Sequence, residues 1–405
     1  MTGEPNGNPS ELARSLRLFF AFRLLATSYL FVPIFMLFQE SRGLSYFERL
    51  ALGGIYSAVI VFAEVPTGVF ADRFGRRRSM LVGAIAMIAS CVLAARADQF
   101  EHFVIAEVLG ALSIALCSGA DSAYLYDLLR RHGREHEYAR RESTASAWHL
   151  MGSAIAFAGS GVLAQIDLSL PYLVTAGVAS VAALVACWLE NDAPGTATAT
   201  RSSWKGQTVD AIGEVVRSPG LAWIVGYSAV VFVLLRATVY VYQPYLVHRG
   251  LGPVEIGLAF AGVYVVASLI AYRTFQLRTR FGDDVVLWGL LASLAVSFVL
   301  LAGVGNCPWM LCLLIVQAIA NGVYSPLTKT LLNSEITDSS RRASVLSVES
   351  MMRRAAMGIF APLVGLYGET DAMLLCGAVG LAGILVLAVV RVRVRATQSI
   401  APDPS

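Results

Sequence analysis

Several ionisable side chains lie inside long apolar stretches of this sequence. Such a group is costly to keep there unless it is paired or hydrated, so each one is a candidate for binding a proton, an ion or a ligand. The competing explanation at each position is a structural ion pair between two helices. The candidates are three carboxylates and four arginines: Glu64, Glu107, Asp121, Arg23, Arg236, Arg353 and Arg354.

Two of the carboxylates fall in one apolar stretch. Glu107 and Asp121 are 14 residues apart, which is about four turns of an α-helix. On one continuous helix they would share a face with Gly110, Cys117 and Tyr124, and we expect that face to line a cavity.

Carboxylates in apolar surroundings can carry protons. Desolvation favours the protonated form of a carboxylate, whereas a nearby arginine favours the charged form. Alternation between the two states would let a proton bind and leave. We predict Asp121 and Glu64 as proton sites, with Glu107 as a third candidate near the outer end of its stretch, where water can hydrate it.

The second half of the chain offers ligand-binding side chains. Arg236, Tyr240 and Gln243 are spaced i, i+4 and i+7 and would share one helix face. Such a stripe suits an amphipathic ligand that needs stacking and a few hydrogen bonds. The other cavity candidates are Arg23, Asn321, Arg353 and Arg354.

These residues must be positioned by membrane-spanning helices. Of the 405 residues 56% are hydrophobic and only 15% are charged, whereas soluble domains carry about 25% charged residues. Runs of about 20 apolar residues can cross a bilayer. The sequence predicts twelve, near 16–38, 48–70, 79–97, 102–126, 144–165, 169–190, 221–245, 255–276, 285–304, 308–332, 343–366 and 372–391.

The distribution of basic residues predicts the orientation. With both termini inside, 23 lysines and arginines fall on cytoplasmic segments and 4 fall on outer loops, which follows the positive-inside rule. We therefore expect a multi-pass protein of the cytoplasmic (inner) membrane. The formal net charge is only +3 and no basic tail is present, so nucleic acid is not an expected partner.

A polar segment divides the chain. Residues 191–220 separate a predicted bundle at 1–190 from another at 221–405, and the stretch from Trp204 to Val216 could form a short amphipathic helix. The two halves also echo each other at offsets of 207 or 208 residues, which favours an internal duplication. The matches are Arg42-Gly43-Leu44 with Arg249-Gly250-Leu251, Gly54-Ile55-Tyr56 with Gly262-Val263-Tyr264, and Arg73-Phe74-Gly75 with Arg280-Phe281-Gly282.

The loop after the second predicted span carries the strongest motif, GVFADRFGRRR over residues 68–78. Gly68 and Gly75 would permit close helix contact and a tight turn. Asp72 is an anion that could meet the positive N-terminus of another helix.

This loop resembles the major facilitator superfamily pattern G-x-L-A-D-R-x-G-R followed by Lys or Arg, and the resemblance in architecture extends from about residue 15 to residue 391. It implies an all-α membrane protein of twelve helices in two six-helix bundles, which works by alternating access. It also implies a cytoplasmic latch between the halves, with Asp72 near Ser340 to Arg342 and Arg76 paired with Asp127. The alternative is that arginines such as Arg73 only enforce topology. The implied gating residues are Gly68, Asp72, Arg73, Gly75, Arg76 and Asp127.

Other family patterns are degenerate. The stretch from Gly152 to Gly161 resembles an antiporter pattern, but Phe157 stands where proline is usual. The fourth span has Ala106 and Glu107 in the region where proton-coupled drug exporters carry an arginine. The segments 64–68 (EVPTG) and 118–121 (SGAD) resemble a bacterial branch whose substrates are mostly unassigned.

The helix neighbours implied by the resemblance also suggest a partner for Arg23, which could pair with Asp121 or Glu64. The function that follows is proton-coupled export of a small amphipathic compound. The alternative is a carrier for an anionic metabolite held by Arg23, Arg236 and either Arg353 or Arg354. Arginines paired with carboxylates would favour the exporter, and unpaired arginines facing a cavity would favour the carrier.

Other classes of protein fit less well. The five histidines are scattered, the six cysteines show no metal-ligand spacing, and no phosphate-binding loop is present. We therefore expect no enzyme activity, no cofactor and no metal. The expected partners are a small-molecule substrate, a proton and the lipid bilayer, and the expected state is a monomer.

Overall fold

The computed structural model describes residues 9–191, 212–303, 307–336 and 342–400, and every regular element in these ranges is a helix. Chain contacts divide the protein into two compact units. The first comprises residues 1–198 and 250–265, and the second comprises residues 199–249 and 266–405. Most of the predicted helix from Trp204 to Val216 lies outside the described residues, although residues 212–217 are helical.

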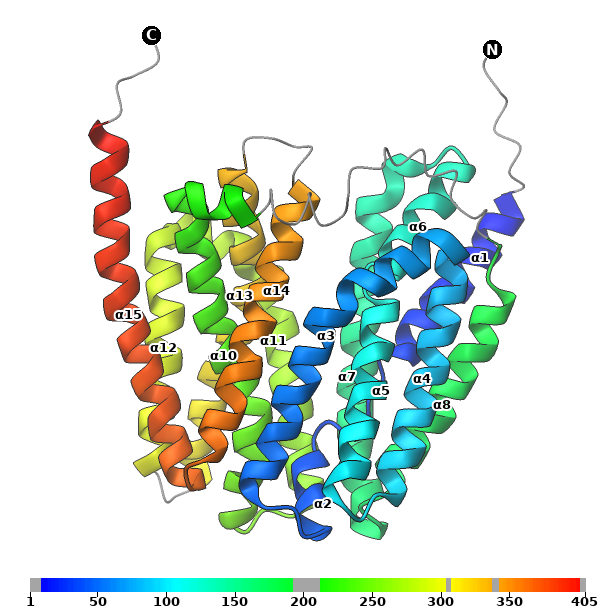
Figure 1. Ribbon diagram of the computed structural model, residues 1–405, viewed down its shortest axis with the longest axis horizontal. Helices are drawn as coiled ribbons and strands as arrows, with labels where there is room; N and C mark the ends of the chain where they lie inside the picture. The colour runs from blue at the N-terminus through cyan, green and yellow to red at the C-terminus, as the bar shows by residue number, and fades with distance from the viewer. Residues whose placement is uncertain (1–8, 192–211, 304–306, 337–341, 401–405) are drawn as a thin grey trace. The chain divides into compact units, whose positions relative to one another are not determined.

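The first half of the chain forms long helices that lie alongside one another (Figure 1). They are α1 (Pro9–Ala26), α2 (Phe35–Ser41), α3 (Tyr46–Phe74), α4 (Arg76–Arg96), α5 (Phe100–Cys117), α6 (Ala120–Arg131), the 3₁₀ turn η1 (Glu135–Glu137), α7 (Tyr138–Ile166) and α8 (Leu170–Trp188). The second half contains α10 (Pro219–His248), α11 (Pro253–Phe281), α12 (Asp283–Gly303), α13 (Cys307–Glu335), α14 (Arg342–Gly365) and α15 (Glu369–Ile400).

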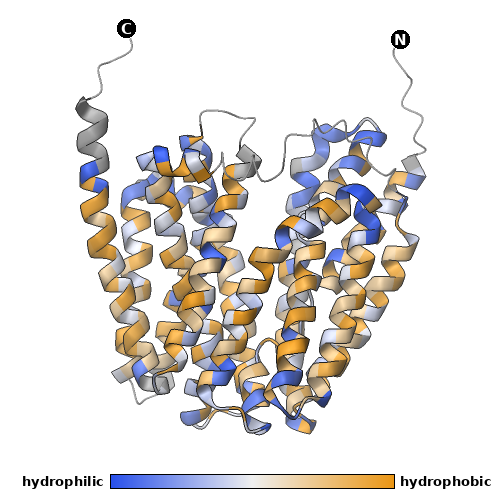
Figure 2. Ribbon diagram, viewed as in Figure 1, coloured by the Kyte–Doolittle hydropathy of each residue, from blue (hydrophilic) through white to orange (hydrophobic). Residues whose placement is uncertain are grey.

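Within the described residues, nine segments are long and apolar enough to cross a membrane. They are Tyr46–Phe74, Arg76–Arg96, Phe100–Arg131, Arg140–Ile166, Leu170–Trp188, Pro219–His248, Pro253–Phe281, Asp283–Gly303 and Asp371–Arg393. Figure 2 shows apolar residues along the length of these helices and polar residues gathered toward their ends. The predicted spans near 16–38, 308–332 and 343–366 are not among the nine. α13 and α14 are continuous helices over the last two.

The first predicted span is not one helix. α1 ends at Ala26, residues 27–34 are non-helical, and α2 begins at Phe35. Pro33 has no backbone N–H and disfavours helix at the residue before it, which explains the interruption. The freed backbone groups find side-chain partners: Thr27 Oγ1 donates to the Arg23 carbonyl at 2.5 Å, and the Leu30 amide donates to Thr175 Oγ1 at 3.1 Å.

The fourth predicted span is also broken. Ser118 and Gly119 separate α5 from α6, and Gly119 has φ +80°. The expectation that Glu107 and Asp121 share one helix face with Gly110, Cys117 and Tyr124 is therefore wrong. Tyr124 lies in the core of the first unit with 0% of its surface exposed, and its hydroxyl donates to the Glu190 carbonyl.

The internal matches seen in the sequence recur as local geometry. Gly43 and Gly250 both have φ +83°, and Gly75 and Gly282 have φ +97° and +82°. The arginine before each glycine of the first pair lies over an aromatic ring four residues earlier: Arg42 over Phe38 at 5.0 Å, and Arg249 over Tyr245 at 4.4 Å. In the other pair, Arg73 lies over Phe74 and Arg280 over Phe281, both at 5.4 Å. These repeated turns support duplication of an ancestral half.

Helix packing repeats in the same way. In the first unit α4 packs against α5 and α8, and in the second unit α12 packs against α13 and α15. Arg77 on α4 donates to the Ala186 and Cys187 carbonyls at the end of α8. The position 207 residues later, Asp284 on α12, pairs with Arg391 on α15. In both units an arginine therefore links the same pair of helices. It lies on α4 in the first unit and on α15 in the second.

The positive φ of Gly75 and Gly282 leads to a first prediction. Gly75→Ala and Gly282→Ala should each destabilise the protein by about 1–2 kcal/mol, because a side chain in the left-handed region meets the backbone. Gly68→Ala is the matched control, since a Cβ there would meet no described atom within 4 Å. The expected close helix contact at Gly68 is therefore not seen among the described residues. Thermal unfolding in detergent would test the prediction, and equal losses for all three variants would contradict it.

Candidate functional site

In the first unit, one arginine and two carboxylates from three helices form a polar cluster. Arg23 on α1 makes an ion pair with Asp121 on α6, and its Nη2 lies 3.6 Å from Glu142 Oε1 on α7. The three side chains are 13%, 15% and 25% exposed. Arg23 was expected to pair with Asp121 or Glu64, and its ion pairs within the described residues are with Asp121 and Glu142.

The two helix breaks position this cluster. Arg23 lies in the last turn of α1 and Asp121 in the first turn of α6. A helix C-terminus favours a cation and an N-terminus favours an anion, so each charge is stabilised by its own helix. Ser122 links the two carboxylates, because its amide donates to Asp121 Oδ1 at 2.6 Å and its hydroxyl to Glu142 Oε1 at 3.1 Å.

The cluster holds more negative than positive charge. One guanidinium faces two carboxylates. His149 on α7 lies near enough to Arg23 for electrostatic interaction. Glu142 and His149 are seven residues apart and share a helix face. Glu142 was not predicted from the sequence, because this residue directly follows two arginines assigned to a loop. Its spacing of seven residues from His149 nevertheless indicates a shared helix face.

The other two predicted proton carboxylates lie outside this cluster. Glu64 is partly buried on α3, where its carbonyl accepts from Thr67 Oγ1 at 3.2 Å. Glu107 is partly buried on α5 and lies within electrostatic range of Tyr172 and Cys91. Of the three predicted carboxylates, Asp121 is the one that forms an ion pair with Arg23 in the described part of the chain.

The second unit has a buried polar cluster of its own. Glu349 on α14 accepts from the Ser228 hydroxyl of α10 and lies 2.8 Å from Arg353 Nε. The Tyr324 hydroxyl on α13 is 2.8 Å from Ser228 Oγ and accepts from Arg353 Nη1 at 3.5 Å. Glu349 is 6% exposed, and the Arg353 guanidinium also lies 4.9 Å from the Phe232 ring. Sequence reasoning missed Glu349, although it stands one turn before Arg353.

The stripe expected on the seventh predicted span is only partly present. Gln243 is 0% exposed and donates to the Val239 carbonyl, so it cannot belong to an open binding face. Tyr240 packs beside the buried side chains of Val233 and Met357. Arg236 is exposed, and its guanidinium lies 5.7 Å from the Phe232 ring.

Two further cavity candidates lie on the helices of the second unit. Asn321 on α13 and Arg354 on α14 are both partly buried. In the cluster around Glu349, Arg353 is the arginine that forms the ion pair with the carboxylate.

The motif loop carries an ion-pair chain. Arg76 pairs with Asp127 on α6, donates to the Ala123 carbonyl at 3.1 Å and lies 3.9 Å from Asp72. Asp72 and Arg73 are exposed, and Gly75 makes the turn between α3 and α4. The expected partner of Asp72 near Ser340 to Arg342 falls on residues and side chains outside those described.

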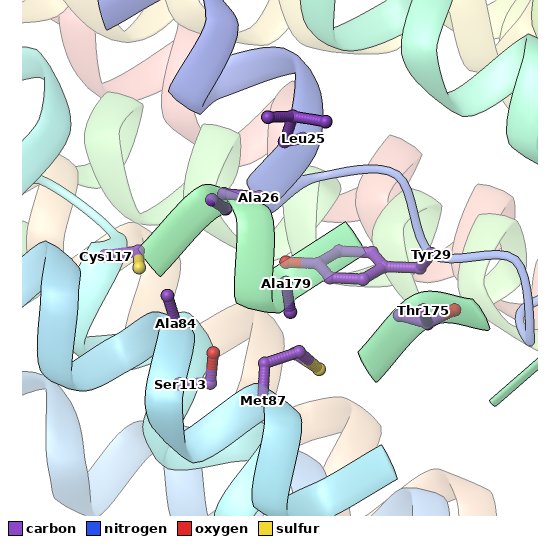
Figure 3. Close-up of a pocket in the computed structure, with 10 residues that line it drawn as sticks. Leu25, Ala26, Tyr29, Ala84, Met87, Ser113, Cys117, Thr175 and Ala179 are labelled. Atoms are coloured by element: carbon purple, nitrogen blue, oxygen red, sulfur yellow. The ribbon is translucent and has the colours of Figure 1, made fainter. Parts of the chain in front are cut away.

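A small pocket lies at the break in the first span. It is lined by side chains of α1, α4, α5 and α8, and the Tyr29 ring from the non-helical segment lies across it (Figure 3). About 10 Å³ is open to the centre of a water molecule, which is room for about one water. This volume is too small for a metabolite or drug.

Long apolar helices with charged clusters among them, one of which lies at two helix breaks, are typical of a multi-pass membrane transporter. A family model described as Major Facilitator Superfamily matches residues 18–282. This match covers more than half of the chain, and the chain belongs to that superfamily.

Relatives and solved structures agree with this assignment. The uncharacterized MFS-type transporter YxaM of Bacillus subtilis (strain 168) is 25% identical over 155 residues, and the match spans only 38% of this chain and 38% of that relative. A variant of the nucleoside transporter NupG has a TM-score of 0.81 at 13% identity and covers 94% of this chain and 99% of its own. A bacterial homolog of the human lysosomal transporter Spinster, inward-facing and unoccupied, has a TM-score of 0.75 at 14% identity and covers 98% and 100%. A peptide transporter POT in complex with sulfate has a TM-score of 0.73 at 15% identity and covers 97% and 96%. At these identities the structures are evidence of the shared fold.

Proposed function

We propose that this transporter couples proton entry to the export of a small amphipathic compound by alternating access. The observation that carries the proposal is the cluster in which Arg23 faces both Asp121 and Glu142. One guanidinium cannot neutralise two carboxylates, so the cluster can take up a proton without being left with excess positive charge. Proton binding would weaken the hold of the carboxylates on Arg23.

The pairing of the arginines supports this proposal over the anion carrier. Arg23 has Asp121 and Glu142, and Arg353 has Glu349. Two of the four arginines that would have held an anion are thus already neutralised. Glu64 and Glu107 are secondary proton candidates in the proposal, because the ion pairs that Arg23 makes within the described residues are with Asp121 and Glu142.

One observation favours the alternative, a carrier for an anionic metabolite. Arg236 is exposed, and within the described residues its guanidinium contacts the Phe232 ring and no carboxylate. An exposed guanidinium beside an aromatic face can hold a carboxylate or phosphate on a planar compound. The nucleoside and peptide transporters with the same fold are named for polar cargo, so such a substrate fits this architecture.

The test is proton movement in proteoliposomes that contain a pH-sensitive dye. A panel of lipophilic cations, neutral drugs and organic anions would be added to the parent protein and to Asp121→Asn, Glu142→Gln and Arg236→Gln. We expect a neutral or cationic drug to evoke proton flux, and we expect Asp121→Asn to reduce that flux at least tenfold.

Each alternative has its own outcome. A response restricted to anions, retained by Asp121→Asn and lost in Arg236→Gln, would replace the exporter with the anion carrier. Glu101→Gln serves as the matched carboxamide control, since it removes an exposed carboxylate outside the cluster.

The proposal also includes the membrane, the oligomeric state and the domain organisation of the protein. We place it in the cytoplasmic membrane as a monomer, with both termini inside and with bundles at 1–190 and 221–405 joined by 191–220. Asp72, Arg76 and Asp127 act in this scheme as a latch on the cytoplasmic side, which the Arg76–Asp127 ion pair supports.

A further inference from the structure

Three arginines converge on one carboxylate where α6 passes into α7. Glu137, in the turn η1, is 8% exposed and forms ion pairs with Arg134, Arg140 and Arg141. Burial alone would raise the pKa of Glu137, but hydrogen bonds from Arg134 and Arg141 outweigh it and hold that pKa below its usual value. Glu137 is therefore charged at neutral pH and neutralises one of the three guanidiniums.

The remaining positive charge is accessible. The side chains of Arg134 and Arg140 are 41% and 70% exposed, whereas that of Arg141 is 26% exposed. A guanidinium has five N–H donors, so a single carboxylate leaves donors on each arginine for an outside acceptor. Because Glu137 holds the three groups together, they present two net positive charges as a preformed unit.

The helix that begins at this cluster exposes a long apolar stripe. Its members are Trp148, Met151, Ile155, Val162 and Ile166, which are between 38% and 75% exposed. Their spacing of three, four and seven residues places them on one face of α7. Glu142 and His149 face the polar cluster of the first unit and lie on the other side of the helix.

The basic cluster and the apolar stripe share a face. At about 100° per residue, Arg140 and Arg141 lie within about 60° of the centre line of the stripe. Phe157, which packs 4.7 Å from the Tyr264 ring within the same unit, lies on the opposite face. The exposed face of α7 therefore carries guanidiniums at its beginning and apolar side chains along the rest of its length.

We propose that this face of α7 is a binding site for an anionic phospholipid, whose phosphate contacts Arg134, Arg140 and Arg141 and whose acyl chains lie along the stripe from Trp148 to Ile166. The candidate span begins at Arg140, which puts the arginines at the headgroup level. Basic residues at this level attract the anionic lipids of the cytoplasmic leaflet. A basic residue that only enforced topology would need neither the buried carboxylate nor the matching stripe.

The test uses the fluorescence of Trp148. The protein would be placed in phosphatidylcholine vesicles that contain increasing fractions of phosphatidylglycerol with brominated chains, which quench a contacting tryptophan. Subtracting the signal of Trp148→Phe isolates this position. We expect phosphatidylglycerol to displace phosphatidylcholine preferentially. We expect Arg140→Gln/Arg141→Gln to reduce that preference by on the order of five-fold for each arginine removed.

Two controls keep the result interpretable. Arg273→Gln/Arg280→Gln removes two exposed arginines from the end of α11 and should leave the preference unchanged. Arg134→Gln removes one member of the cluster and provides a milder variant if the double substitution does not fold.

Other outcomes would overturn the proposal. Equal loss in the α11 control would mean that overall charge, and not this site, selects the lipid. Loss of the preference on adding inorganic phosphate would mean that the cluster binds a free ion. Because the measurement needs no transported substrate, it can fail or succeed independently of the exporter proposal.

Discussion

Replacing Arg23 by glutamine is expected to destabilise the protein by about 3–5 kcal/mol, because Asp121 and Glu142 would lose their cation in a poorly solvated site. Arg23 is 13% exposed and is the cation that both carboxylates share. The midpoint of thermal unfolding in detergent would measure the loss.

A double substitution separates charge from packing. Arg23→Gln/Asp121→Asn removes the positive and one negative charge together, and we expect it to regain most of the stability lost in the single variant. Arg236→Gln is the matched control, since Arg236 is exposed and makes no ion pair within the described residues. A loss as large for Arg236→Gln as for Arg23→Gln would show that the pairing is not the source of the effect.

Glu349→Ala should be the most damaging substitution in the second unit, again by about 3–5 kcal/mol. The change leaves Arg353 without its carboxylate and removes the carboxylate that accepts from the buried Ser228 hydroxyl. Thermal unfolding would measure the loss. Glu349→Gln should be milder than Glu349→Ala, because the amide oxygen can still accept from Ser228.

The control for this prediction removes both charges. Glu349→Gln/Arg353→Gln should be more stable than Glu349→Ala, because neither charge is then left unpaired. If the double variant is less stable than the alanine variant, the ion pair contributes net stability of its own, and the cost of an orphaned charge does not account for the loss.

Much of the fold was predictable because it depends on composition and length. Apolar runs, the motif loop and the repeated turns at Gly43 and Gly250 are visible in the sequence, and all lie on helices or turns in the structure. The breaks were harder to foresee. A hydropathy run through Pro33 reads as one span even though that proline cannot continue a helix. The residues at the other break, 118–121 (SGAD), were read as a family resemblance and not as the end of a helix.

The site was predictable in part. The sequence suggested Asp121 or Glu64 as the partner of Arg23, because the family resemblance makes their helices neighbours, and the structure pairs Arg23 with Asp121. Glu142 and Glu349 were missed for different reasons: one stands next to loop arginines, and the other was overlooked beside two conspicuous arginines. Gln243 was assigned to an open face by its spacing alone, but burial depends on which neighbouring helix covers that face, and spacing carries no information about the neighbour.

The helix breaks also distinguish the two halves mechanically. The residues 207 positions after 27–34 lie inside α10, which is continuous from Pro219 to His248. The position corresponding to Gly119 is Pro326, inside the continuous α13. The helices of the first half are therefore interrupted at positions where the corresponding helices of the second half are continuous. If a unit bends during the transport cycle, we expect the first unit to bend more than the second. A substitution that restricts the backbone at Gly119 should therefore reduce this bending more than a substitution at Pro326.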